Sequence, residues 1–269
     1  MFASNPFDSL SGVLSPLFMQ VFLVVMVLLV ALGTLFDMVH KGSARYFFAN
    51  KRARLSRARP VGGGEMIGIA VQTALVDVLT SGEFCNQRRR VAHLLGMYGF
   101  VFYLLATIVM VFGLSTAGAW PVLWWLGALM VCVGGYWFWF FIRVDVSAEG
   151  HSPWRLVRAD LFIVSLLASV TLGLLWALSG GGTGWLFGLY LLANVVLFGG
   201  VPWSKFSHMF FKPAAAFDKR LTRADGTHEN LPTLSRDDPA QRERHSMELL
   251  REAPMEMGLG IKREAPRHY

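Results

Sequence analysis

The feature that most constrains this chain is a set of five long apolar runs. They cover residues 16–39, 91–114, 120–142, 161–178 and about 185–201. A helix needs about 20 predominantly apolar residues to cross the hydrocarbon core of a bilayer. Most of the runs reach that length, and the fifth ends near Val201 or a little later. The sequence therefore predicts an all-α integral membrane protein built as a five-span transmembrane helical bundle.

The composition agrees with a membrane protein and excludes several other classes. Charged residues make up 16% of the 269 residues, whereas soluble domains have about 25%. The chain is also rich in Gly, Trp and Phe, with 27, 9 and 21 of them, a profile common in membrane helices and their interfaces. Its two cysteines, Cys85 and Cys132, are too few for an iron–sulfur cluster ligated by this chain alone or for a Cys-rich zinc module.

The basic residues predict the orientation of the bundle. Ten Lys and Arg lie in residues 40–90, three in 143–158 and twelve after residue 201, and these account for all 25 in the chain. In a five-span arrangement all of them fall on one side, which the positive-inside rule makes cytoplasmic. We therefore expect the N-terminus outside, the C-terminus in the cytoplasm and a multi-pass protein of the inner (cytoplasmic) membrane. The net charge of +7 is then explained by the basic residues on the cytoplasmic side and by their contact with lipid headgroups. We therefore predict no nucleic-acid partner.

This topology divides the chain into segments with distinct expected roles. Residues 1–15 form a short outer N-terminus, and residues 16–39 form a retained first span, too long for a signal peptide. Residues 40–90 form a basic cytoplasmic linker, in which 66–79 are apolar but too short to span and suit an interfacial helix. Residues 91–208 hold spans two to five. Residues 209–269 form a cytoplasmic tail that is partly disordered or binds a partner.

Two histidines lie at the predicted cytoplasmic ends of spans two and five. His93 lies less than one turn inside the basic boundary, and His208 lies about 35 Å from the outer end of span five at 1.5 Å per residue. If these spans are neighbours, the two imidazoles lie at a similar depth and suit the axial positions of a b-type haem. Gly96 and Gly99 would let a flat macrocycle approach the helix, although both equally permit close helix packing. Each histidine can also be an ordinary interfacial polar residue.

Two stretches resemble the nitrate reductase gamma subunit family and related membrane subunits of quinone-interacting oxidoreductases. One stretch is Asp77-Val-Leu-Thr, followed by Gln87-Arg-Arg-Arg-Val-Ala-His93 and an aromatic span that contains glycines. The other is Pro202-Trp-Ser-Lys-Phe-Ser-His208-Met-Phe, with Lys-Pro soon after it. Among such proteins, the stand-alone anchors of sulfur metabolism, such as those associated with adenylylsulfate reductase, are the most similar in size. The resemblance implies His93 and His208 as ligands of the cytoplasmic haem.

This sequence departs from the two-haem members of that family. They use a second pair of histidines about ten residues after the first and about eighteen residues before the last. Those positions hold Tyr103 and Tyr190 here. The resemblance therefore implies one b haem rather than two, and it makes transmembrane electron transfer through stacked haems an unsuitable mechanism for this chain. We expect Tyr103 and Tyr190 to have a structural role.

The resemblance also implies a soluble partner and a quinone. The chain has no four-cysteine pattern and no glycine-rich dinucleotide fingerprint, so flavin or iron–sulfur centres would belong to separate cytoplasmic oxidoreductase subunits. Candidate quinone-contacting residues at the exit of span five are Trp203, Ser204 and Lys205. We thus expect a membrane subunit that exchanges electrons with membrane quinone through a single b haem.

Two other readings of the sequence remain open. The first is a haem-free structural anchor with the same spans and the same kind of partner. The second is a transporter, which would place polar or charged groups near the bilayer midplane. In spans one, two, three and five, the polar residues near the middle of the span are Thr107 and Asn194. No nucleophile–base pair or metal-ligand set lies within the spans, so no catalytic residue is predicted.

Overall fold

In the computed structural model, the described residues are 2–228 apart from 41–42, 83, 85–86, 143–153, 155, 205 and 207, together with Leu231. Throughout these residues the regular elements are helices. They group into two compact units. Of the described residues, the first unit contains those up to Asp37 and those from Val91 to Phe206, and the second contains those from Met38 to Arg90 and from His208 to Leu231. Helices α1 (Pro16–His40) and α4 (Gln87–Val111) each cross the division between the units.

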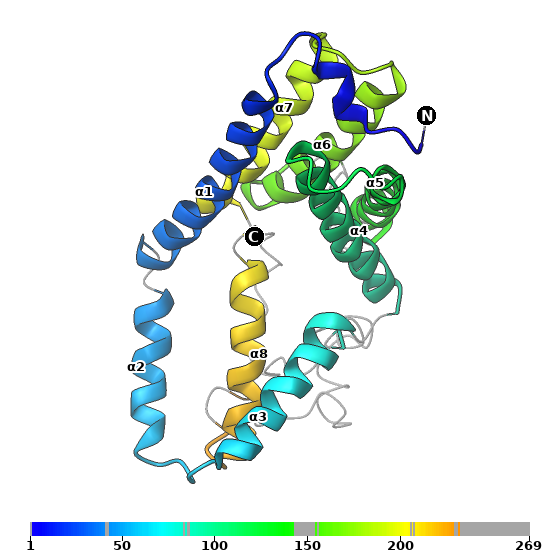
Figure 1. The fold of residues 1–269 in the computed structure, drawn as a ribbon. Helices are drawn as coiled ribbons and strands as arrows, with labels where there is room; N and C mark the ends of the chain where they lie inside the picture. Colours follow the sequence, from blue (N-terminus) through cyan, green and yellow to red (C-terminus); the bar gives the residue numbers. More distant parts are fainter. Residues whose placement is uncertain are drawn as a thin grey trace. The chain divides into compact units, whose positions relative to one another are not determined.

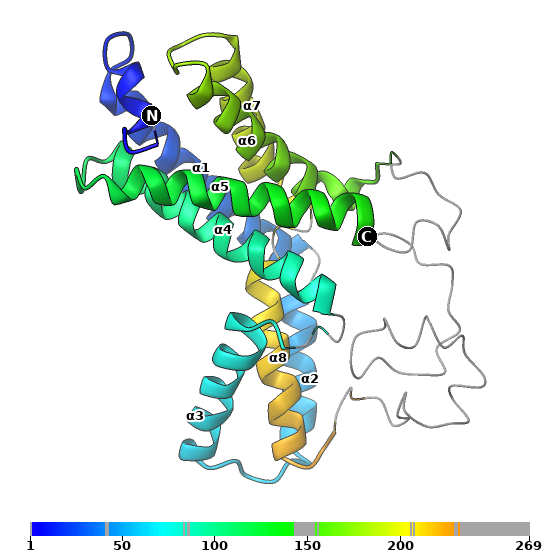
Figure 2. The same ribbon diagram turned by 90° about the vertical axis from the view of Figure 1, so that its right-hand side faces the viewer.

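The first unit is a helical bundle (Figure 1). Besides α1 and α4 it contains α5 (Ala119–Trp137), which continues as a π-helical turn, η3 (Phe138–Ile142), and then α6 (Leu161–Leu178) and α7 (Trp185–Gly199). Short 3-10 turns complete it: η1 (Pro6–Leu10), η4 (Arg158–Asp160) and η5 (Val201–Trp203). Helices α4 and α5 lie side by side, as do α6 and α7 (Figures 1 and 2).

In the part of the chain that the structure describes, four helices are long and apolar enough to cross a membrane: α1, α4, α6 and the continuous helix Ala119–Ile142. This finding supports a multi-pass membrane protein. Helix α7 is equally apolar but has 15 residues, a length of about 22 Å at 1.5 Å per residue. It ends where Gly199 and Gly200 precede Pro202, because proline cannot extend the hydrogen-bond ladder of the preceding helix.

Glycines set the close packing of α4 against α5. A Cβ added at Gly127 would lie 2.6 Å from the Tyr103 nitrogen and 2.7 Å from the Gly99 oxygen, and one at Gly134 would lie 2.6 Å from the Ala92 oxygen. No real side chain tolerates such distances, so the two backbones touch where these residues face each other. Small residues at such crossings are typical of membrane bundles, where van der Waals packing replaces the hydrophobic effect between helices.

The connection between α6 and α7 also depends on glycine. Gly180, Gly181 and Gly182 have φ values of +93°, +75° and +83°, which side chains other than glycine rarely adopt. This turn brings the Gly182 carbonyl to within 2.8 Å of the indole Nε1 of Trp176, which donates to it. A buried indole at the end of α6 thereby gains its partner.

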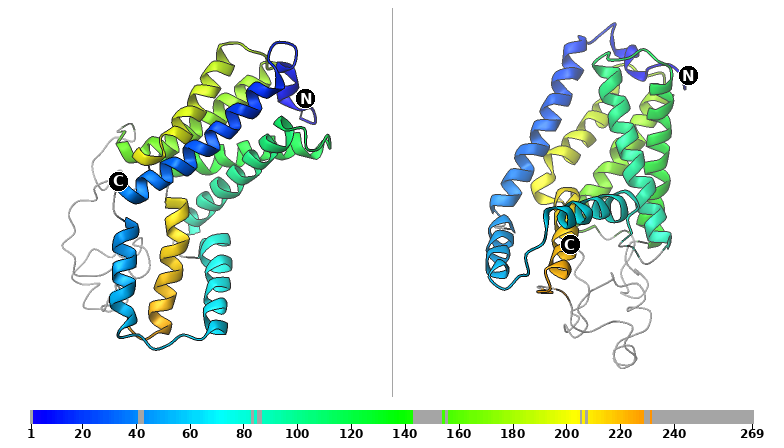
Figure 3. Two further views of the ribbon diagram at one scale, coloured as in Figure 1. Left: turned by 60° about the vertical axis from the view of Figure 1, so that its left-hand side comes forward. Right: turned by 60° about the horizontal axis from the view of Figure 1, so that its bottom comes forward.

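The second unit is also made of helices (Figure 3). It contains α2 (Ser43–Leu55), α3 (Gly63–Gln72), the π-helical continuation η2 (Thr73–Leu79) and α8 (His208–Ala224). Helix α8 packs against α3 and η2. The segment predicted as a basic linker and the first part of the predicted tail therefore fold together. The tail beyond Leu231 lies outside the described residues.

Candidate functional site

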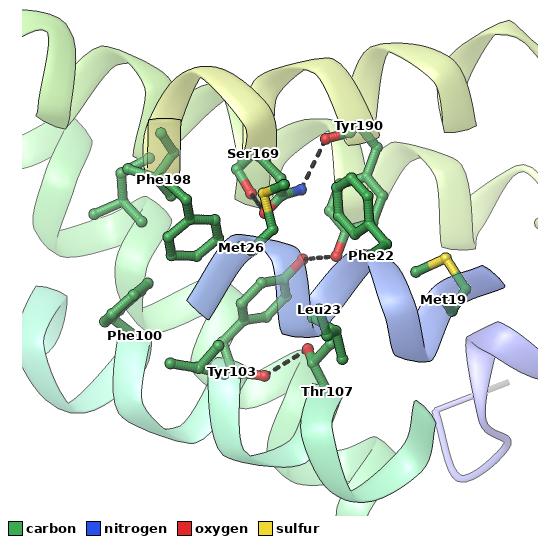
Figure 4. Close-up of a pocket in the computed structure, with 14 residues that line it drawn as sticks. Met19, Phe22, Leu23, Met26, Phe100, Tyr103, Thr107, Ser169, Tyr190 and Phe198 are labelled. Atoms are coloured by element: carbon green, nitrogen blue, oxygen red, sulfur yellow. Dashed lines mark hydrogen bonds between the residues drawn. The ribbon is translucent and has the colours of Figure 1, made fainter. Parts of the chain in front are cut away.

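The bundle contains a small cavity between α1, α4, α6 and α7 (Figure 4). Its volume is about 20 Å³, which is room for little more than one water molecule. The residues that line it are Met19, Phe22, Leu23, Met26, Phe100, Tyr103, Leu104, Thr107, Leu166, Ser169, Tyr190, Asn194, Leu197 and Phe198. The cavity is therefore too small for a haem or a quinone ring in this arrangement.

Two tyrosines meet at the cavity and join α4 to α7. The Tyr103 hydroxyl donates to the Tyr190 hydroxyl at 3.0 Å, and both side chains are buried. Gly173 of α6 makes room for the pair, since a Cβ there would lie 2.7 Å from the Tyr103 hydroxyl oxygen and 3.1 Å from the Tyr190 ring. These are the two positions where the resemblance expects ligands of a second haem, and here the two phenols occupy the space between the helices.

Further hydrogen bonds extend this pair to the neighbouring helices. On one side, the Thr107 hydroxyl donates to the Tyr103 carbonyl at 2.7 Å and accepts from the Trp124 indole of α5 at 3.0 Å. On the other side, the Asn194 amide donates to the Tyr190 carbonyl at 2.8 Å and accepts from the Ser169 hydroxyl of α6 at 3.0 Å. All of these groups are neutral. The network links four helices without placing a charge in lipid.

The candidate haem ligand His93 lies in α4 and is half-buried. Gly96, one turn further along α4, is also half-buried, and a Cβ added there would meet no atom within 4 Å. The helix therefore has room for at least a methyl group at Gly96, one turn from His93. Gly99 differs, because a Cβ there would lie 2.7 Å from the Gly127 oxygen of α5. Gly99 serves the contact between α4 and α5.

The remaining sequence-predicted site residues fall in different places. His208 begins α8 in the second unit, and its side chain and Lys205 lie outside the described residues. Ser204 is buried, and its hydroxyl accepts from the Phe206 backbone nitrogen at 3.2 Å. Trp203 is exposed. His93 belongs to the first unit and His208 to the second.

Sequence reasoning missed a cluster of ion pairs in the second unit. Arg54 of α2 is 2% exposed, and its Nη1 donates to Oδ1 of Asp218 on α8 at 2.8 Å. Its Nε lies 3.1 Å from Oδ2 of Asp225, a close ion pair whose angle does not suit a hydrogen bond. Arg59 then donates to the Ala224 carbonyl at 2.7 Å, which satisfies a free acceptor at the end of α8.

A second ion pair joins η2 to α8. Arg220 donates two hydrogen bonds to the Asp77 carboxylate, from Nε to Oδ2 at 2.7 Å and from Nη2 to Oδ1 at 3.0 Å. The hydrogen bond to the Asp77 carboxylate raises the pKa of the Arg220 guanidinium above its ordinary value, so the arginine remains charged at every physiological pH. Lys212 of α8 lies over the ring of Phe84 at 5.3 Å, a cation–π contact.

The comparisons give no relative for this chain. No model of a known family, no curated protein and no solved structure matches it. Among the described residues there is also no group of three His, Cys, Asp or Glu side chains arranged to hold a metal ion. The function of this chain is therefore inferred from its own residues and from the sequence resemblance described above.

Proposed function

We propose that this chain is the membrane anchor subunit of an electron-transfer complex in the cytoplasmic membrane. The observation that carries the proposal is the folded second unit, whose helices are tied by buried ion pairs. A multi-pass protein that only needed to cross the membrane would not require such a module. The module offers a rigid surface for cytoplasmic flavin or iron–sulfur oxidoreductase subunits, in keeping with the resemblance to quinone-interacting complexes.

The topology that we propose has five spans, with α7 as the fifth. The mean hydropathy and the aromatic residues of α7 match its neighbours, and α7 packs along α6 within the bundle. Its short length is compatible with a span that continues through the 3-10 turn at Val201–Trp203. The distribution of all 25 Lys and Arg supports an outer N-terminus and a cytoplasmic second unit.

Co-purification from native membranes tests the anchor role. The tagged full chain in mild detergent is expected to bring down a flavin or iron–sulfur protein, identified by mass spectrometry and by its absorption. Arg54→Ala, which breaks the ion pairs between α2 and α8, should release that partner while the anchor stays in the membrane. Arg52→Ala is the matched control, because Arg52 lies on the same helix and is exposed. A partner retained equally by both variants would contradict docking on the second unit.

A specific observation favours an additional redox role, namely the open space beside Gly96, one turn from His93. This space supports the proposal of one b haem, held by His93 and, as the resemblance implies, by His208. A bound b haem would supply one-electron transfer between the soluble partner and quinone. Trp203, Ser204 and Lys205 remain the proposed quinone contacts. The Tyr103–Tyr190 hydrogen bond supports a single haem rather than two.

An optical difference spectrum tests the haem directly. The reduced-minus-oxidised spectrum of the purified protein should show the α-band of a low-spin b haem. His93→Ala and His208→Ala should each abolish it, whereas His228→Ala, at an exposed histidine, should leave it unchanged. A partner-bound, folded preparation without the band would overturn the haem and leave the anchor role intact.

A further inference from the structure

Helix α3 and its continuation η2 carry an exposed apolar stripe. Its members recur every four residues and are all substantially exposed: Ile67 at 67%, Val71 at 51%, Leu75 at 52% and Leu79 at 45%. Residues four apart lie on one face of a helix. A stripe of large aliphatic side chains in contact with water is unfavourable at about 25 cal/mol for each Å² of apolar surface, so this face is expected to have a covering.

The opposite face of the same helix is already occupied. Thr73 is buried, and Asp77 is held by the two hydrogen bonds from Arg220 of α8. These residues are also four apart, and about 100° per residue places them on the side away from the stripe. The ion pair therefore fixes the rotation of the helix about its axis, and the stripe points away from α8.

The charges around the stripe suit an anionic surface. Between Gly63 and Leu79 the only ionisable residues are Glu65 and Asp77, and both pair with arginines, Arg59 and Arg220. The stripe is thus flanked by neutralised acids. Exposed cations precede it at Lys51 and Arg52, and three arginines follow it at residues 88–90. Apolar residues with basic flanks are the pattern of helices that lie in the headgroup region.

The chain also fixes the end of the stripe next to a membrane-spanning helix. Arg90, in the first turns of α4, donates from its Nε to the Thr80 carbonyl at 2.7 Å. Thr80 directly follows η2, and the Gly82 nitrogen turns back to donate to the Val76 carbonyl at 2.7 Å. Helix α4 is one of the four helices long and apolar enough to span. The end of η2 is therefore held at the first turn of that helix, next to its arginines.

We propose that α3 and η2 form an interfacial membrane-binding element, with the stripe Ile67, Val71, Leu75 and Leu79 inserted among the acyl chains of an anionic leaflet. Asp77 and Arg220 act as positioning residues, because their ion pair aims the stripe. Helix α8 would thereby be coupled to the lipid surface through the face that it holds. The proposal does not depend on the redox role or on the identity of a soluble partner.

Site-directed fluorescence in lipid nanodiscs tests this proposal on the full chain. In a background of Cys85→Ser and Cys132→Ala, an environment-sensitive fluorophore is attached at Ile67→Cys, Val71→Cys or Leu75→Cys. The discs contain phosphatidylcholine and phosphatidylglycerol, with or without brominated acyl chains. All three stripe sites should show blue-shifted emission that brominated lipid quenches and aqueous iodide does not. Ala70→Cys is the matched control, since Ala70 is exposed on the same helix but away from the stripe, and it should respond to iodide alone.

Three results would overturn the proposal. Iodide quenching at the stripe equal to that at Ala70 would show a face in water. Protection from iodide without quenching by brominated lipid would show that a protein surface covers the stripe. Lipid quenching at Leu75 alone, with Ile67 behaving like Ala70, would show that only the end of η2 meets the membrane. Adding Asp77→Asn should reduce lipid quenching at Ile67 if the ion pair aims the stripe, and Glu65→Gln is the matched control for that change.

Discussion

The helices within the first unit and the helices within the second unit are held together by different kinds of interaction. In the bundle, the contacts between helices are glycine crossings and neutral hydrogen bonds, such as Tyr103 with Tyr190 and Trp124 with Thr107. In the second unit, the described contacts between helices include charged pairs, Arg54 with Asp218 and Asp225, and Arg220 with Asp77. The difference follows the solvent that each unit is built for. Lipid penalises an unpaired charge and favours close backbone packing, whereas a small unit in water, as we propose for the second unit, has little apolar core and relies on paired charges.

The largest effect is expected where a buried charge loses its partners. Arg54→Ala removes the arginine that neutralises the buried Asp225 carboxylate, which keeps only its hydrogen bonds from Thr227, and breaking a buried ion pair costs about 3–5 kcal/mol. We expect α2 and α8 to lose protection against hydrogen–deuterium exchange in the full-length protein, while α5 and α6 keep theirs. Arg52→Ala, on the exposed side of α2, should leave both regions protected. Equal protection in the two variants would mean that the ion pairs do not stabilise the second unit.

The corresponding change in the bundle is a single methyl group. Gly127→Ala puts a Cβ 2.6 Å from the Tyr103 nitrogen, so α4 and α5 must separate, and overpacking of this kind costs about 1–3 kcal/mol. Gly188→Ala is the control, because a Cβ there meets no atom within 4 Å. Reversible unfolding in mixed micelles should show lower stability for Gly127→Ala only. A loss of the same size at both positions would point to helix propensity rather than to the crossing.

The same comparison explains how far the sequence could predict the fold. The sequence predicted five spans, and four of them are confirmed as helices long and apolar enough to cross a membrane, because each is a continuous apolar run whose length the bilayer dictates. The role of Gly99 was harder to predict from the sequence, because a glycine in a span can make room either for a flat ligand or for a neighbouring helix. Only the position of Gly127 across the crossing distinguishes these roles, and the sequence alone carries no information about that partner.

The second unit was the harder part to predict for a different reason. Its key pairs join residues far apart in the chain, 143 positions for Asp77 and Arg220 and 164 for Arg54 and Asp218. In the sequence Arg54 is one of several cations in a basic stretch, with nothing to distinguish it from exposed Arg52. One available signal was Asp77, a lone acid in an otherwise apolar helix, which requires a partner if that helix packs. The candidate site has the same limit, since His93 and Gly96 share one helix but His208 lies in another unit.

A smaller effect is expected for the ion pair that orients η2. Asp77→Asn keeps the shape of the side chain but removes the charge from two hydrogen bonds, a loss of about 1 kcal/mol. Exchange at η2 and the facing part of α8 should rise, while Glu65→Gln, in a largely exposed pair with Arg59, should have little effect. Folding raises the pKa of Arg220. The contribution of a cation with a raised pKa is fully present below its ordinary pKa and is lost only as the pH rises above it, which for an arginine is strongly alkaline. Corrected exchange rates should therefore not depend on this arginine between neutral and mildly alkaline pH.

The smallest effect is expected for the tyrosine pair. Its size distinguishes a hydrogen bond that only joins two helices from a pair with a further function. Removing the hydroxyls singly and together, with Tyr103→Phe and Tyr190→Phe, gives a double-mutant cycle whose coupling energy should be about 0.6 kcal/mol, the average for hydrogen bonds between membrane helices. The value is small because each phenol can bond elsewhere when the bundle loosens. Steric-trap or micellar unfolding of the four proteins measures it. A coupling near zero would mean that the space between α4 and α7 is held open by Gly173 and packing alone. A coupling energy of several kcal/mol would mean that the two hydroxyls depend on each other far more than a hydrogen bond between helices requires, and it would indicate a chemical role for this cavity.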